Sequence, residues 1–182
     1  MLEKILLNTS ANKLFSFLTL HSGASFYDKE LSEKTGLSRG MTNRLLNSFL
    51  KAGLVERERK GRMWFYSLKP SPLPRQFRIY ENLALLNDLV ESLKPLAQKI
   101  VLFGSAAIGT DSAESDIDLL VIARKKEEAS KKIRKYESER EIAPVVQSPE
   151  EYVTARSSDK VFYNRVAEGI TLYEKEPDEQ RL

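Results

Sequence analysis

The chain has 182 residues and a mass of 20.8 kDa, a length that suits one ordinary domain or two small ones. Hydrophobic residues make up 41% and charged residues 30%, as in a folded globular protein. Cysteine is absent and His21 is the single histidine, which excludes disulfides, thiol nucleophiles and sites that need two histidines. The sequence has neither a membrane-spanning run nor the pattern of a signal peptide at residues 1–10. We therefore expect a cytoplasmic protein with no membrane partner.

The charge is unevenly distributed along the chain. Residues 1–70 hold 12 Lys/Arg and 6 Asp/Glu, whereas residues 71–182 hold 17 and 20, so a basic first part precedes a mildly acidic remainder. Three prolines fall within residues 70–74, and prolines interrupt helices and central strands. We expect a linker there that separates two regions with different roles.

Hydrophobic periodicity in the first region predicts three helices followed by a hairpin. The expected helices cover residues 12–20, 28–34 and 39–52, and the expected strands cover 54–59 and 63–68, with a turn at Lys60–Gly61. In the third helix, Ser38 is a suitable N-cap, and the apolar stripe is expected at Met41, Leu45, Leu46, Phe49 and Leu50. Residues 31–68 resemble the winged helix-turn-helix family in this order of elements.

That resemblance implies binding to duplex DNA, which the positive charge of this region favours. The third helix is expected to present Arg39, Thr42, Asn43 and Asn47 to the major groove, and the hairpin to present Arg57, Arg59, Lys60 and Arg62 to phosphates. Winged helices often dimerise to read two half-sites, so a homodimer is a possible assembly, although no feature of the sequence proves it. The alternative is a solvated polar face on a domain that mediates protein contacts.

The second region contains the patterns that predict chemistry. A helix over residues 77–94 precedes a buried strand that ends at Gly104-Ser105. A sharp change from strand to helix exposes backbone N–H groups, which suit a phosphate. Asp116 and Asp118 begin a second apolar strand and project to one face, where their mutual repulsion favours a divalent cation such as Mg²⁺. The phosphate-binding turn and the carboxylate pair together predict phosphoryl or nucleotidyl transfer.

The segment FGSAAIGTDSAESDIDLLVI resembles the glycine-serine and Asp-x-Asp motif of the DNA polymerase beta superfamily. It is most similar to minimal nucleotidyltransferases, including those with an N-terminal winged helix, over roughly residues 99–175. The resemblance implies that Gly104, Ser105 and Ser115 bind the nucleotide and that Asp116 and Asp118 hold Mg²⁺. It also implies that a nucleoside triphosphate, with ATP as the first choice, donates NMP and releases pyrophosphate.

Two positions depart from the family pattern. Ile108 stands where the family usually has a basic residue just before the second glycine. Active members also carry a third carboxylate on a later strand, which deprotonates the acceptor. In the expected strand over residues 141–147 the one acid is Glu141, which is either this base or a solvated glutamate.

The remaining elements are expected to be a mixed-charge helix over residues 124–135, one helix over 152–168, a short strand over 170–173 and a frayed end over 177–182. The fold class is therefore α+β. A helix-rich winged helix-turn-helix domain is expected over residues 1–70, a linker and connecting helix over 71–98, and a small mixed-sheet nucleotidyltransferase domain over 99–182.

Three functions remain open from the sequence. The first is a Mg²⁺-dependent nucleotidyltransferase coupled to a DNA-binding winged helix. The second is a transcriptional regulator whose weakly active domain senses a nucleoside triphosphate. The third is an antitoxin of a HEPN-type toxin, whose partner protein is encoded by an adjacent gene.

Overall fold

The computed structural model describes residues 8–176, apart from the side chains of residues 156 and 157. The frayed end expected over residues 177–182, and most of the N-terminal segment searched for a signal peptide, lie outside the described residues. Within the described part, no helix is both long and apolar enough to cross a membrane.

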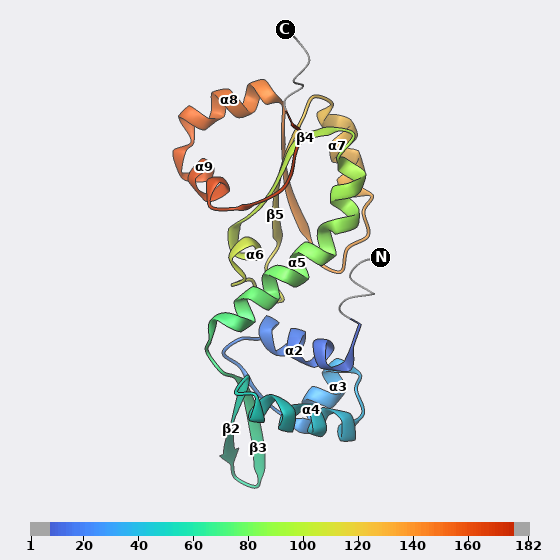
Figure 1. Cartoon of the computed structure of the whole chain (residues 1–182), viewed down its shortest axis with the longest axis vertical. Helices are drawn as coiled ribbons and strands as arrows, with labels where there is room; N and C mark the ends of the chain where they lie inside the picture. The colour runs from blue at the N-terminus through green and yellow to red at the C-terminus, as the bar shows by residue number, and fades with distance from the viewer. Residues whose placement is uncertain (1–7, 177–182) are drawn as a thin grey trace.

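The N-terminal elements form the expected winged helix-turn-helix. Helices α2 (Ser10–Leu20), α3 (Asp28–Thr35) and α4 (Arg39–Lys51) accompany strands β1 (Ser25–Tyr27), β2 (Val55–Lys60) and β3 (Met63–Leu68). The strands pair antiparallel in the order β1-β3-β2, and β2 and β3 project from the body as the wing (Figure 1). The side chain of Ser38 caps α4 by accepting a hydrogen bond from the backbone of Met41. Apolar side chains of all three helices and the sheet share one core.

Helix α5 (Pro72–Leu93) connects the two halves of the molecule (Figure 1). It begins five residues before the predicted start at Phe77, because Pro72 and Pro74 occupy its first turn, where a missing N–H breaks no helical bond. Near its start, Phe77 packs against Phe15 of the N-terminal core, with ring centroids 4.9 Å apart. Its later turns cover the C-terminal sheet, so one helix contributes to both cores.

The C-terminal half is a mixed four-stranded sheet flanked by helices, as predicted. Its elements are β4 (Ala97–Phe103), α6 (Gly104–Ile108), β5 (Ile117–Ala123), α7 (Lys126–Arg134), β6 (Ile142–Gln147), α8 (Pro149–Ser158), α9 (Lys160–Ala167) and β7 (Ile170–Glu174). The strand order is β6-β5-β4-β7, with β5 and β6 parallel and the other pairs antiparallel. Pro144 lies in the edge strand β6, where a missing N–H is tolerated.

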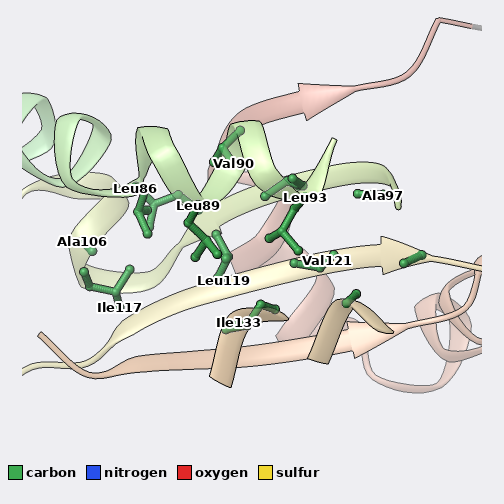
Figure 2. Packing of buried hydrophobic residues seen from close by; sticks show 14 of the residues in the cluster. Leu86, Leu89, Val90, Leu93, Ala97, Ala106, Ile117, Leu119, Val121 and Ile133 are labelled. Atoms are coloured by element: carbon green, nitrogen blue, oxygen red, sulfur yellow. The ribbon is translucent and has the colours of Figure 1, made fainter. Parts of the chain in front are cut away.

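The sheet is covered on both faces because β4 and β5 are apolar on both sides. Ile100, Leu102 and Leu119 face α5 and α7, where Figure 2 shows Leu86, Leu89 and Leu93 above the strands. Residues of opposite parity in the same strands, including Val101 and Leu120, pack against α8 and α9. The continuous helix predicted over residues 152–168 is wrong, because Asp159 ends α8 and caps α9.

Candidate functional site

The turn that ends β4 lies directly against a carboxylate. Gly104 opens α6 with a φ of +69°, a left-handed conformation that side chains rarely adopt. A Cβ atom at Gly104 would clash with Oδ2 of Asp118. The strand register explains this contact, because Phe103 of β4 pairs with Asp118 of β5. A residue with a side chain at position 104 would therefore displace Asp118.

Asp116 and Asp118 lie at the start of β5, on either side of the buried Ile117. Partial burial raises the pKa of Asp118, the nearby Arg165 lowers it, and the charge of Asp116 raises it again. The net direction is upward, so the carboxylate has lost hydration that no protein partner fully replaces. A cation bound between the two carboxylates would stabilise their ionised forms.

A cavity of about 230 Å³ lies beside this turn. It is lined by Gly104, Ser105, Ala107, Ile108, Thr110, Arg165 and Glu168. Arg165 of α9 places Nη2 3.8 Å from Oδ2 of Asp118 and its guanidinium 5.9 Å from the Phe103 ring centroid. The sequence alone did not single out Arg165, because a basic residue on an amphipathic helix is common. The fold supplies it to the same cavity as Ser105.

Ser115 and Glu141, which the sequence also predicts as site residues, do not line this cavity. The hydroxyl of Ser115 accepts a hydrogen bond from the backbone N–H of Ser112 at 3.0 Å, so it closes the turn before Asp116. Glu141 is exposed and directly precedes β6, as Asp116 directly precedes the paired start of β5. The residue beside Asp118 on β6 is Ala143. Within residues 8–176, no three His, Cys, Asp or Glu residues are grouped so that they could hold a metal ion.

Helix α4 presents fewer of the predicted groove-reading residues than expected. Thr42 is fully buried and its hydroxyl donates to the Ser38 carbonyl, so its predicted DNA contact is wrong. It is buried because it lies four and seven residues before Leu46 and Phe49, on the apolar face of the helix. Asn47 is exposed, and so is Arg44, a further cation of this helix that is not among the predicted contacts.

Two further residues of α4 are already paired with Asp28 of α3. Arg39 donates to Oδ2 of Asp28 at 3.0 Å and Asn43 donates to the same atom at 3.2 Å. Burial raises the pKa of Asp28, but these hydrogen bonds outweigh it and bring the pKa below its ordinary value. A DNA contact through Arg39 or Asn43 would therefore compete with this pairing.

The wing carries the predicted basic residues on its surface. Arg57, Arg59, Lys60 and Arg62 are all exposed. The guanidinium of Arg57 lies 4.4 Å from the centroid of Trp64, which is itself 42% exposed. This stacking keeps an aromatic ring and a cation together on one face of the hairpin.

Comparison with protein families identifies the C-terminal half. Residues 87–178 match the family described as "Polymerase beta, Nucleotidyltransferase". The chain belongs to this nucleotidyltransferase family. The match includes the Gly104 turn, the Asp116–Asp118 pair and Arg165. The comparison with curated proteins gave no match.

Solved structures resemble this chain over about half of its length. The transcriptional regulator BldR from Sulfolobus solfataricus is 23% identical, with 51% of this chain and 67% of that chain covered and a TM-score of 0.37. A possible transcriptional regulator from Methanosarcina mazei Go1 is 13% identical, with 50% and 82% covered and a TM-score of 0.35. YusO from Bacillus subtilis is 18% identical, with 50% and 64% covered and a TM-score of 0.35. The N-terminal fold is defined by the order and pairing of its own helices and strands.

The residues present are suited to a magnesium nucleotide. Mg²⁺ in such sites uses one or two protein carboxylates and completes its shell with phosphate oxygens and water. Asp116 and Asp118 supply that number, and a side chain at position 104 in place of Gly104 would displace Asp118. Among the described residues no third acid is grouped with this pair, which is compatible with binding of Mg²⁺ through one or two protein carboxylates.

Proposed function

We propose that the chain is a Mg²⁺-dependent nucleotidyltransferase, which moves NMP from a nucleoside triphosphate to an acceptor, and that its winged helix binds duplex DNA. The observation that carries the catalytic part is the contact between the Gly104 backbone and the Asp118 carboxylate. It brings the glycine-serine turn and the carboxylate pair to the same edge of the sheet, beside the cavity that Arg165 also lines.

Each side chain of the site has a distinct role in this proposal. Ser105 and Arg165 bind phosphate oxygens, and Arg165 provides the positive charge that the motif lacks at Ile108. Asp116 and Asp118 would hold the Mg²⁺ ion, which would supply stabilisation of the negative charge on the triphosphate.

The reaction replaces a phosphoanhydride bond of the triphosphate with a phosphate ester on the acceptor. An acceptor oxygen forms a bond to the α-phosphorus, and the bond from that phosphorus to the oxygen bridging it to the β-phosphate breaks. Pyrophosphate leaves, and Glu141 takes the acceptor proton. The chain's part is to align the acceptor and the leaving group, which accounts for much of catalysis in phosphoryl transfer.

Binding of Mg·ATP tests the site directly. We expect titration calorimetry to show that Asp118→Asn weakens binding at least about tenfold, because one of two ligands is lost. Glu114→Gln is the matched control, since Glu114 is an exposed acid in the loop that leads to Asp116. Equal affinity in wild type and Asp118→Asn would overturn the site.

A nucleotide-sensing regulator is the second candidate. It is favoured by Ala143, which occupies the β6 position beside Asp118 where a third acid would complete the site. This function requires tight Mg·ATP binding together with no transfer. The antitoxin hypothesis stays a prediction, to be examined by reading the gene adjacent to this one for a HEPN-type product.

A further inference from the structure

A buried polar cluster outside the site joins three segments that are distant in the sequence. It consists of Arg78 and Asn82 of α5, Asp111 in the loop after α6 and Arg140 in the loop before β6. The side chain of Asp111 is 0% exposed, that of Arg78 5% and that of Arg140 12%. Buried charges are costly unless they are paired and hydrogen-bonded, so such a cluster fixes the segments that carry it.

The guanidinium of Arg140 connects this cluster to the backbone beside Asp116. Its Nη1 donates to Oδ2 of Asp111 at 2.6 Å and to Oδ1 of Asn82 at 2.9 Å. Its Nη2 donates to the carbonyl oxygen of Ser115 at 2.6 Å. Nη1 of the guanidinium is therefore bound within the cluster, while Nη2 donates to the backbone of Ser115, the residue directly before Asp116.

The peptide group on the other side of Asp116 is bonded by Glu141, the residue that follows Arg140 in the chain. The backbone N–H of Ile117 donates to the carbonyl oxygen of Glu141 at 2.9 Å. Consecutive residues 140 and 141 thus bond the peptide groups on both sides of Asp116. Asn82 extends the same support to the glycine-serine turn, because its Nδ2 donates to the carbonyl oxygen of Ala106 in α6 at 3.0 Å.

We propose that Arg140 is a positioning residue, anchored by Asp111 and Asn82, which fixes the backbone of Asp116 for binding of the metal–nucleotide complex. The inference rests on the proposed function, but its structural part does not need the enzyme to be active. A lysine cannot replace Arg140, because one ammonium cannot reach both Asp111 and the Ser115 carbonyl in the fixed geometry of the guanidinium fork.

The test combines hydrogen exchange with binding of Mn·ATP, a spectroscopically visible analogue of Mg·ATP. The variants are Arg140→Lys and Arg140→Gln, with Arg134→Gln as the control that removes an exposed guanidinium from α7. We expect amides of residues 112–117 to exchange at least about tenfold faster in both Arg140 variants while β4 keeps its protection. We expect Mn·ATP affinity to fall about tenfold to a hundredfold, as when outer-shell partners of metal ligands are removed. Arg134→Gln should change neither readout.

The outcomes separate the two proposals. Unchanged exchange over residues 112–117 in Arg140→Lys, or faster exchange spread evenly over both halves of the chain, would overturn the positioning role. If Arg140→Gln fails to fold because Asp111 loses one of its two arginine partners, Arg140→Lys, which keeps the charge, still decides. Failure of the wild-type protein to bind Mn·ATP would overturn the proposed function. The hydrogen-exchange result would still decide whether Arg140 fixes the backbone beside Asp116.

Discussion

Glycine is favoured at position 104 for two reasons, which are its left-handed backbone conformation and the close approach of Asp118. The φ of Gly104 is +69°, and its Cα faces the carboxylate of Asp118. Gly36 has a nearly identical φ of +67° but nothing within 4 Å of a built Cβ, so the two glycines separate these effects. Alanine at either position should cost about 1–2 kcal/mol of stability for the left-handed backbone alone.

We predict that Gly104→Ala loses Mg·ATP binding whereas Gly36→Ala does not, because only the former displaces Asp118. The displaced atom is the end of a flexible side chain, so urea unfolding should show similar stability losses in both variants. Intact Mg·ATP binding in Gly104→Ala, measured by titration, would contradict the close contact.

Glu141 is the residue that decides whether a base is present. If it accepts the acceptor's proton, Glu141→Gln should lower the transfer rate about 10²- to 10⁴-fold while Mg·ATP binding is preserved. The neighbouring exposed Glu139 provides the control Glu139→Gln. A transfer rate that is the same in wild type and Glu141→Gln would remove the glutamate from the mechanism.

The sequence was enough to predict the motif residues, but not the buried polar cluster that binds the backbone beside them. Gly104, Ser105, Asp116 and Asp118 are close in sequence, so strand alternation and a familiar spacing were enough to bring them to one edge. No pattern in the sequence distinguishes Arg140 and Asp111 from ordinary solvated charges. Only the fold shows that they are buried together, since that depends on α5 lying across the loops at that end of the sheet.

At the scale of elements, most helices and strands follow from periodicity, and the misses have local causes. Helix α5 begins earlier than predicted because prolines that interrupt a helix interior are accepted in its first turn. The break between α8 and α9 is not predictable from periodicity because Asp159, a capping residue, has no strong helix-breaking neighbour. Thr42 lies on the buried face of α4 because its spacing with Leu46 and Phe49 fits that face as well as the polar one.

The surface formed by α4 and the wing predicts a salt-dependent affinity for duplex DNA. Arg44→Gln and Arg62→Gln should each weaken binding and reduce the slope of log affinity against log salt by about one, if each cation meets a phosphate. Thr42→Val, at a position inaccessible to DNA, should leave the slope unchanged. Fluorescence anisotropy with a labelled duplex over a salt series measures both. An affinity that does not depend on salt would contradict DNA binding by this surface.

At the scale of the whole molecule, the contact between the two halves is expected to be sensitive to pH. Glu81 of α5 is 8% exposed and faces Arg78, and a hydrogen bond with Ser16 links it to α2. Burial raises its pKa above the ordinary value, although Ser16 and Arg78 act in the opposite direction. The folded chain therefore binds this proton more tightly than the unfolded chain does.

It follows that the Glu81 contribution to the free energy of unfolding decreases as pH rises from the ordinary glutamate pKa through the raised one. We predict that the stability of wild type relative to Glu81→Gln falls over this interval. Urea unfolding of both proteins between pH 4 and pH 7 measures it. A relative stability that increases with pH would contradict the raised pKa.

The central claim is that the carboxylate pair and the glycine-serine turn perform nucleotidyl transfer. The most direct measurement is incorporation of label from α-phosphate-labelled ATP into acceptors of a cell lysate in the presence of Mg²⁺. The control is the double variant Asp116→Asn, Asp118→Asn. We predict a labelled acceptor with wild type and none with the double variant. Tight nucleotide binding without any labelled acceptor would contradict the enzyme and favour the nucleotide-sensing regulator.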